Sequence, residues 1–186
     1  GDTKMVDMMI GALHDPFHNI HMGVTAENIA AKWGITREDQ DKLAVESHNR
    51  AERASQTGVF KDQIVPVTLK SKKGDVQYAT DEHFRPGATM EDLAKLKPAF
   101  LKENGTVTAG NASGINDAAA AVVLMEAGAA KARGAKPLAR LVAYAHAGVD
   151  PKYMGIGPVP ATQLALKRAG LTVNDLDVIE ANEAFA

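Results

Sequence analysis

The sequence contains no cysteine among its 186 residues. That absence excludes disulfide bonds, thiolate metal ligands and a cysteine nucleophile from these residues. No apolar run approaches the roughly 20 residues that a membrane-spanning helix requires. The first residues, GDTKMVDMMIGALHD, lack the basic leader and the long apolar stretch of a signal peptide. We therefore expect a cytoplasmic protein with no membrane partner.

An excess of charge of one sign is also missing. Lys and Arg number 21 and Asp and Glu number 23, which gives a formal net charge of −2, and the two signs are interleaved along the chain. Surfaces that bind nucleic acid or anionic lipid need a basic excess, so no nucleic-acid partner is expected. With 45% hydrophobic and 24% charged residues, the composition is that of a globular protein with one or two cores.

Three histidines near the N-terminus raise the question of a metal site. His14, His18 and His21 are four and three residues apart, which on a helix places them on one face. Pro16 disfavours a continuous helix there, and Asp15 is the only nearby carboxylate. We therefore predict no metal site, and favour histidines that line a pocket or cap a loop.

The first third of the chain predicts two helices. One spans residues 26–33, between a capping Thr25 and Gly34, and the other runs from Thr36 to about Gln56. The part that follows is of mixed character, so residues 1–105 together are expected to form an irregular α+β region.

A hairpin is predicted next. Residues 64–69 read as a strand, Pro66 indicates an edge position, and residues 76–78 are a possible return strand. The basic turn between them, residues 70–75, is either a solvated hairpin tip or a surface that approaches a phosphorylated ligand. A brief helix is expected at 90–96.

After Gly105 the pattern becomes β-α-β-α-β. Apolar strands separated by helices are typical of an α/β sheet covered on both faces, with ligands at the strand ends. The predicted strands are 119–125, 138–145 and 176–181, and the predicted helices are 127–133 and 161–169.

The stretch 106–125, TVTAGNASGINDAAAAVVLM, is the least ordinary in the chain. A β-branched run leads into a loop of small residues, 109–114, and an apolar run begins at Ala118. Small residues let another backbone or a ligand come close. The loop is therefore either a tight structural crossing or the wall of a binding site.

Seven motifs in order resemble the thiolase family, specifically its short-chain biosynthetic β-ketothiolases (acetyl-CoA acetyltransferases). They are HMGVTAEN at 21–28, TREDQD at 36–41, FKDQIVPV at 60–67, KLKPAF at 95–100, TVTAGNASGIND at 106–117, GVDPKYMGIGPVPAT at 148–162 and NEAFA at 182–186.

The resemblance implies a fold and an assembly. The fold would be a thiolase-like layered α-β-α-β-α core of two similar α/β halves, incomplete here, with an α+β loop-domain insertion. Residues 1–105 would be the loop domain, and residues 106–186 the first part of the C-terminal half. Members of the family are usually homotetramers.

The resemblance also implies an acyltransferase. The reaction would be a Claisen condensation of acetyl-CoA with acetyl-CoA or another short acyl-CoA, and the reverse thiolysis of a 3-ketoacyl-CoA. Coenzyme A thioesters would be substrates, and no cofactor would be bound permanently. The family's nucleophilic cysteine, its GHP histidine and its CxG cysteine are absent from these residues, so the segment alone is predicted to be inactive.

Carried over position by position, the resemblance assigns one catalytic residue, Asn182. It would fix a water of the oxyanion hole, where enolate charge needs fixed donors; capping a strand end is the alternative. Ser113 would hydrogen-bond the pantetheine arm, with Ala109 and Gly110 giving backbone approach.

Further binding residues are assigned by the same resemblance. His21 and Met22 would meet the acyl end and the pantetheine, and Arg85 would lie near the adenine and ribose. Asp92 departs from the family, in which relatives often carry a serine, and we leave it out of the site. Apolar channel positions, for which core packing is the alternative, are Leu13, Phe100, Met154 and Phe185.

Two competing functions follow from the same residues. A thiolase-like body could bind acyl-CoA or lipid without catalysis, and the presence of Cys and His in the remaining regions would discriminate between the two. Half of a dinucleotide-binding fold is disfavoured, because no G-x-G-x-x-G follows a predicted strand.

Overall fold

The computed structural model describes residues 1–186. The chain forms two compact units: residues 1–114 together with 183–186, and residues 115–182. The chain therefore leaves the first unit after Gly114 and returns to it at Glu183. The predicted division into a loop domain (1–105) and a C-terminal half (106–186) is a statement about family domains and not about compact units, and it stays a prediction.

The first unit begins with α1 (Met8–Ala12) and α2 (Met22–Trp33). The predicted Thr25 cap of α2 is wrong, because the helix starts one turn earlier. His21 is the N-cap, and its ring accepts a hydrogen bond from the Gly23 N–H at 3.0 Å. Thr25 instead donates its hydroxyl to the Met22 carbonyl within the helix. Gly34 ends the helix in the left-handed conformation (φ 67°), as predicted.

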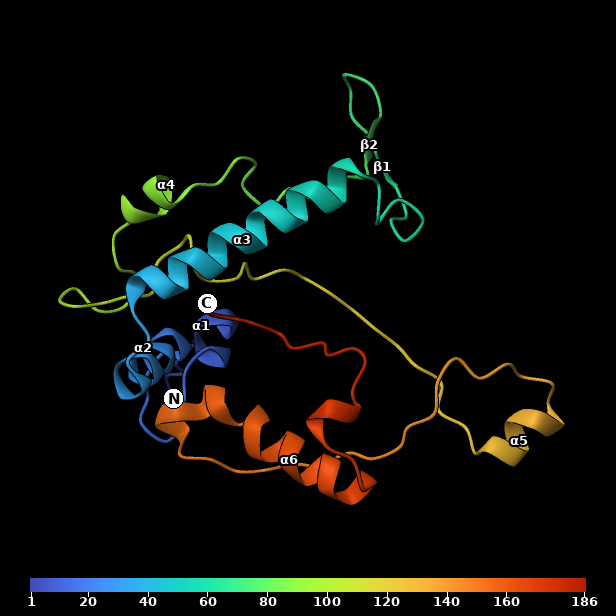
Figure 1. Ribbon diagram of the computed structural model, residues 1–186. Coiled ribbons are helices and arrows are strands. Elements are labelled where there is room, and N and C mark those ends of the chain that lie inside the picture. The colour runs from blue at the N-terminus through green and yellow to red at the C-terminus, as the bar shows by residue number, and fades with distance from the viewer. The chain divides into compact units, whose positions relative to one another are not determined.

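The longest helix, α3 (Arg37–Gln56), matches its prediction closely. Thr36 and Asp39 form a reciprocal capping box that satisfies backbone donors at the first turn. The short helix α4 (Met90–Ala94), capped by Thr89, packs against α3, and Figure 1 shows it beside the first turns of that helix.

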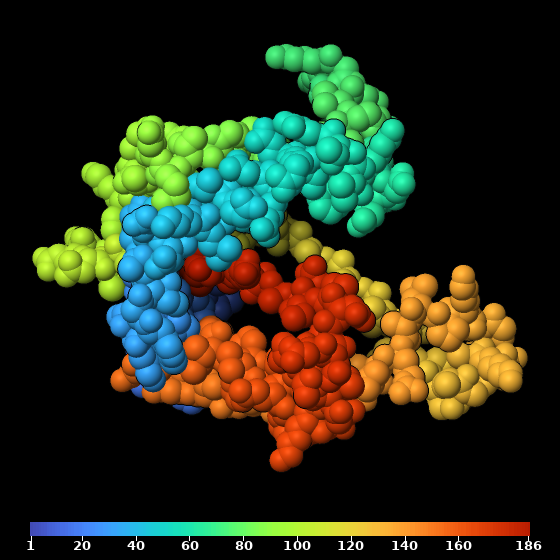
Figure 2. Space-filling model, in the orientation of Figure 1, coloured from blue at the N-terminus to red at the C-terminus, as the bar shows by residue number.

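The only sheet is a two-stranded antiparallel hairpin of β1 (Val67–Leu69) and β2 (Val76–Tyr78). Val67 pairs with Tyr78 and Leu69 with Val76. The predicted hairpin is confirmed, although its first strand begins after Pro66. All six strand residues are exposed, and the hairpin projects beyond the C-terminal end of α3 (Figures 1 and 2).

The second unit contains α5 (Ala127–Ala132), the 3-10 helix η1 (Pro151–Ile156), α6 (Pro158–Ala169) and the 3-10 helix η2 (Val173–Asp175). Both predicted helices form, but α6 begins at Pro158. Proline is tolerated in a first turn, where its missing N–H costs no helical hydrogen bond. Within this unit Arg168 donates to the carbonyl of Tyr144 at 2.8 Å.

The three predicted strands at 119–125, 138–145 and 176–181 do not form. These segments are irregular, and many of their apolar side chains are exposed, with Val123 88% and Leu138 100% accessible. A strand exists only where a neighbouring strand pairs with its backbone, and no other segment of the chain pairs with these three. An apolar run alone therefore misassigned them.

The core of the first unit lies where α2, α3 and α4 meet the stretch 106–111. Val107 and Thr108 are its largest fully buried side chains, and Ala30, Ala44 and Leu93 are also buried. Polar groups are buried there too: Thr25, Glu27, Gln40, Asp41 and Asn111. No helix is both long and apolar enough to cross a membrane.

Candidate functional site

Four aromatic rings form a continuous row in the first unit. His14 meets His21 edge-on with ring centroids 5.2 Å apart, and His21 stacks on Phe100 at 4.7 Å. Phe100 in turn meets Phe185 edge-on at 6.3 Å. Rings from the N-terminal turn, the segment after α4 and the chain's last residues thus come together, and such pairs favour these stacked and edge-on geometries.

The start of α2 fits closely beneath this row. Gly23 is buried, and a Cβ atom there would overlap the Phe100 ring, so only glycine lets the helix pass under it. Met22 donates its N–H to the carbonyl of Leu13 at 2.8 Å. The turn 13–22 is therefore held against α2 by its backbone.

The last residues of the chain pair with the small-residue loop. Ala112 and Phe185 form an antiparallel bridge. Ser113 donates its N–H to the Ala184 carbonyl at 2.9 Å, and Ala186 donates its N–H to the Asn111 carbonyl at 2.9 Å. These bonds fix Phe185 beside the loop that carries Ser113.

The small-residue loop is a tight structural crossing at Gly110, the first of the two predicted alternatives. At Gly110 a Cβ atom would lie 2.5 Å from Leu96 Cδ1 and 3.1 Å from Leu93 Cγ, so this position is a tight structural crossing. Ala109 and Ser113 are exposed. The binding-wall interpretation therefore stays open at those two residues.

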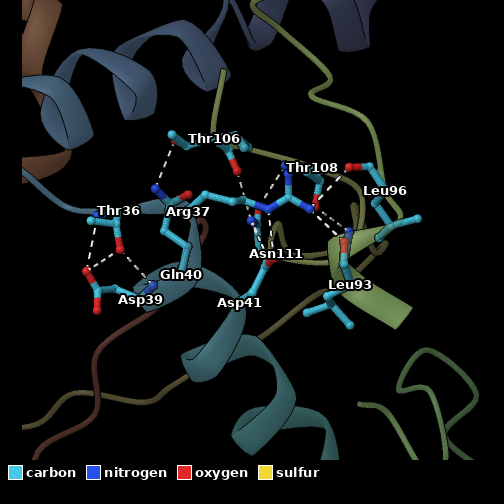
Figure 3. A network of polar contacts seen from close by, with 12 residues as sticks. Thr36, Arg37, Asp39, Gln40, Asp41, Leu93, Leu96, Thr106, Thr108 and Asn111 are labelled. Carbon is cyan, nitrogen blue, oxygen red and sulfur yellow. Dashed lines mark hydrogen bonds and ion pairs between the residues drawn. The ribbon is translucent and has the colours of Figure 1, made fainter. Parts of the chain in front are cut away.

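Asn111 joins the loop to α3 through a buried amide. Its Oδ1 accepts from the Thr108 N–H at 2.7 Å, and its Nδ2 donates to Asp41 at 2.9 Å and to the Thr106 carbonyl at 3.0 Å. Figure 3 shows Asp41 and Asn111 at the centre of this network. Asp41, whose side chain is only 3% exposed, is also paired with Arg37 at 2.7 Å.

Arg37 extends the network to α4. Its Nη2 donates to the carbonyls of Leu93 at 2.6 Å and Leu96 at 3.1 Å, as the dashed lines of Figure 3 show. Because buried ionised groups are costly unless they are paired and hydrogen-bonded, this geometry accounts for the buried Asp41 carboxylate.

His21 is held in its uncharged form. Burial, and then the neighbouring His14, lower the pKa of His21 below its ordinary value of 6.5. The geometry requires the same state, because Nδ1 can accept from the Gly23 N–H only when it carries no proton. His21 therefore presents a neutral ring to Phe100.

A second histidine, His48 of α3, connects two other segments. Its Nδ1 accepts from the Arg85 N–H at 3.2 Å. Burial lowers the pKa of His48, a hydrogen bond to the Gly110 backbone opposes that shift, and His83 and Arg85 lower the pKa further. The ring thus links the 81–87 loop to the small-residue loop.

The structure brings most of the sequence-predicted site residues together. The aromatic row and its flanks contain Leu13, His21, Met22, Phe100, Ser113 and Phe185. Ala109 and Gly110 lie on the same small-residue loop as Ser113, where Gly110 packs against Leu93 and Leu96. Arg85 stands apart from the row, exposed, with only its backbone bound to His48. Met154 on η1 and Asn182 belong to the second unit, and both are exposed.

The three N-terminal histidines do not gather around one point. His14 Nδ1 donates to the Ile10 carbonyl at 2.6 Å, and the His18 backbone N–H donates to Asp15 at 2.6 Å. No group of three or more histidine or carboxylate side chains is arranged to hold a metal ion.

Sequence reasoning missed the buried polar residues Glu27, Asp41 and Asn111. Glutamate and aspartate on a helix usually face solvent, so nothing in their spacing marks them as buried. Asn111 carried the one available signal, a polar amide inside an otherwise small and apolar loop. Asp92, left out of the site, accepts from the Thr89 hydroxyl that caps α4 and pairs with Lys95.

Comparison with known proteins assigns the chain to a family. Residues 1–128 match the family described as "Thiolase, N-terminal domain", and residues 135–186 match "Thiolase, C-terminal domain". The chain belongs to the thiolase family.

Thiolases of several organisms align with the whole of this chain. It is 70% identical to the beta-ketothiolase BktB of Cupriavidus necator and 57% identical to an acetyl-CoA acetyltransferase of Rhizobium meliloti, in both cases over 100% of the chain and 47% of the relative. The chain thus spans about half the length of the curated relatives it matches.

Solved thiolase structures resemble the fold. The acetyl-CoA acetyltransferase of Bacillus anthracis superposes with a TM-score of 0.88 at 50% identity, covering 100% of this chain and 47% of that one. Human mitochondrial 3-ketoacyl-CoA thiolase in complex with CoA gives 0.83 at 43% identity, covering 100% of this chain and 45% of that one. The predicted thiolase-like α/β fold class, incomplete here, is confirmed.

Proposed function

We propose that the protein carrying this chain is a thiolase-type acyltransferase. It condenses acetyl-CoA with acetyl-CoA or another short acyl-CoA, and in reverse it cleaves a 3-ketoacyl-CoA with CoA. The observation that carries the proposal is the 70% identity with a beta-ketothiolase over all 186 residues. The CoA complex of a structural relative supports CoA thioesters as the ligand class.

These residues form the binding half of the proposed chemistry. The neutral His21 ring, Met22 and Leu13 form one wall, with Phe100 stacked on His21 and Phe185 edge-on to Phe100. Ser113, an exposed residue of the small-residue loop, hydrogen-bonds the pantetheine, and the cationic Arg85 meets the nucleotide end. By family resemblance, Met154 contributes an apolar channel contact in the complete protein.

Asn182 is the catalytic residue of the proposal within this chain. Its amide fixes a water molecule that donates to the thioester oxygen, where negative charge develops in the enolate. The chain has no cysteine, so the nucleophile that carries the acyl group comes from outside these residues. The active assembly is a cytoplasmic homotetramer with no permanently bound cofactor.

The decisive experiment uses the complete protein. We expect it to release free CoA from acetyl-CoA and to cleave acetoacetyl-CoA when CoA is added. Asn182→Ala should lower kcat by about 10²-fold and leave KM nearly unchanged, as does the loss of an oxyanion donor elsewhere.

The competing function is binding of acyl-CoA or a lipid without catalysis. It is favoured only by the absence of a thiol nucleophile from these 186 residues. A complete protein that binds acetyl-CoA in calorimetry but releases no CoA would establish it and reject the acyltransferase.

A further inference from the structure

Glu27 is a buried carboxylate to which the proposed chemistry gives no task. It lies on α2, and the residue is 4% exposed. Its two oxygens accept from the Thr106 N–H at 2.9 Å, from the Thr106 hydroxyl at 2.7 Å and from the Val107 N–H at 2.9 Å. Desolvating a carboxylate is unfavourable unless its oxygens are hydrogen-bonded, and here three neutral donors from one short segment supply those bonds.

The two ends of this contact belong to the two walls of the candidate site. Glu27 sits on α2, whose N-cap is His21 and whose first residue is Met22. Thr106 begins the stretch that leads to Ser113, and Gln40 of α3 holds the same Thr106 hydroxyl at 2.9 Å. The reach of the Glu27 side chain therefore fixes how far the start of α2 lies from the small-residue loop.

The same contact is coupled to the aromatic row. Ala99 donates its N–H to the Val107 carbonyl at 2.9 Å, and the next residue, Phe100, stacks on His21. A displacement of Thr106 and Val107 relative to α2 would consequently shift Phe100 on the His21 ring as well as Ser113.

We propose that Glu27 is a positioning residue that sets the spacing between the His21–Phe100 wall and the Ser113 loop, and with it the affinity for the pantetheine arm of CoA thioesters. This inference rests on the proposed function, which supplies the CoA thioester as the ligand. Glu27 acts through the reach of its side chain: its donors are two backbone N–H groups and a hydroxyl, so no partner cation requires its charge.

Two substitutions in the complete protein separate reach from charge. Glu27→Gln keeps the length. Its Oε1 can accept both backbone N–H groups, and its amide can donate to the second lone pair of the Thr106 hydroxyl, which already accepts from Gln40. Only the bond with the Thr106 hydroxyl reverses its direction, and the hydroxyl proton loses its carboxylate acceptor. Glu27→Asp keeps the charge but is one methylene shorter. We expect Glu27→Asp to raise the KM for acetoacetyl-CoA about tenfold with kcat within about twofold, and Glu27→Gln to leave KM within about threefold of the parent.

Thr25→Val is the matched control. Thr25 is equally buried on α2, but its hydroxyl bonds only within the helix, to Met22. Its loss destabilises α2 without moving the walls, so KM should be unchanged. A merely structural Glu27 would lower kcat in proportion to the folded fraction and leave KM alone in Glu27→Asp, and that result would overturn the proposal.

An exchange measurement decides the contact independently of activity. The amides of Thr106 and Val107 should exchange slowly with solvent deuterium in the parent and in Glu27→Gln, and at least about tenfold faster in Glu27→Asp. If the parent released no CoA, the proposed function would fail. The exchange measurement would still test the contact of Glu27 with Thr106 and Val107. Equal exchange in Glu27→Asp and the parent would overturn the inference alone.

Discussion

At Gly23 the backbone of α2 passes beneath the Phe100 ring with no room for a side chain. Gly23→Ala should therefore lower the free energy of unfolding by up to about 2 kcal/mol: overpacking costs ~1–3 kcal/mol, and the preference of a helix for alanine over glycine offsets ~1 kcal/mol of that cost. Urea denaturation measures the change.

Gly11→Ala is the matched control for that substitution. On α1 a Cβ at Gly11 would meet only Val6 Cγ1, at an ordinary 3.7 Å. The variant should be as stable as the parent or more so. Equal losses at the two glycines would show that helix position, and not the Phe100 ring, decides the outcome.

The uncharged His21 and His48 make stability depend on pH. Burial is the main reason that the pKa of each lies below the ordinary value of 6.5. A histidine whose pKa is lower in the folded than in the unfolded chain stabilises the fold at pH values above its unfolded pKa. This stabilisation is lost as pH falls from about 6.5 through the folded pKa, because in that range the unfolded chain binds more protons than the folded chain.

His21→Asn tests this dependence, because asparagine is a good helix cap but does not titrate. The free energy of unfolding, measured by urea denaturation from pH 8 down to about pH 5, should fall less steeply below about pH 6.5 in the variant than in the parent. A slope that did not change would contradict the assignment of a neutral His21.

Among the elements, α3 depends most visibly on its first turn. Thr36 accepts from the Asp39 N–H at 3.1 Å. Thr36→Ala should cost about 1 kcal/mol of stability, read from the urea midpoint at an unchanged slope. Thr36→Ser keeps the hydroxyl and should cost much less; equal losses would mean that the threonine methyl group, not the cap, matters.

The helices show what the sequence alone could predict. The ends of α3 follow from chemistry local to the chain: Thr36 three residues before Asp39 at the start, and Gly58 just beyond the end. The start of α2 does not, because its cap is His21, whose ring is placed by Phe100, 79 residues away in the sequence. Local capping rules preferred Thr25, which lies inside the helix.

The sequence alone did not predict correctly which segments form strands or which carboxylates are buried. Residues 138–145 have the composition of a buried strand, yet strand formation depends on a partner that composition does not reveal. Glu27 and Asp41 look like ordinary helix-surface residues, and only their long-range donors, Thr106 and Asn111, bury them. The site assignments of Leu13, His21, Met22, Phe100 and Phe185 came from the family resemblance, since periodicity alone did not distinguish these residues from core.

Across the whole molecule, some backbone amides are hydrogen-bonded and others are unpaired, so we expect hydrogen exchange with solvent to be slow in some segments and fast in others. Amides in α2, α3 and the 106–111 stretch should exchange slowly in this 186-residue chain, because helical and side-chain bonds hold them. Those of 116–124 and 138–145 should exchange within seconds to minutes. Mass spectrometry of peptides resolves the segments, and slow exchange at 116–124 would contradict the unpaired arrangement.

The bridge between Ala112 and Phe185 also has a consequence for how the gene can be rearranged. Residues 115–182 leave and re-enter the first unit at neighbouring points of its backbone. Residues 115–182 could therefore be removed as one segment. A few glycines and serines could join Gly114 to Glu183 without stretching the chain. The entropic cost of closing such a loop changes only slowly with its length. The shortened polypeptide would keep Phe185 beside Ser113, so the aromatic row could be engineered apart from the residues that interrupt it.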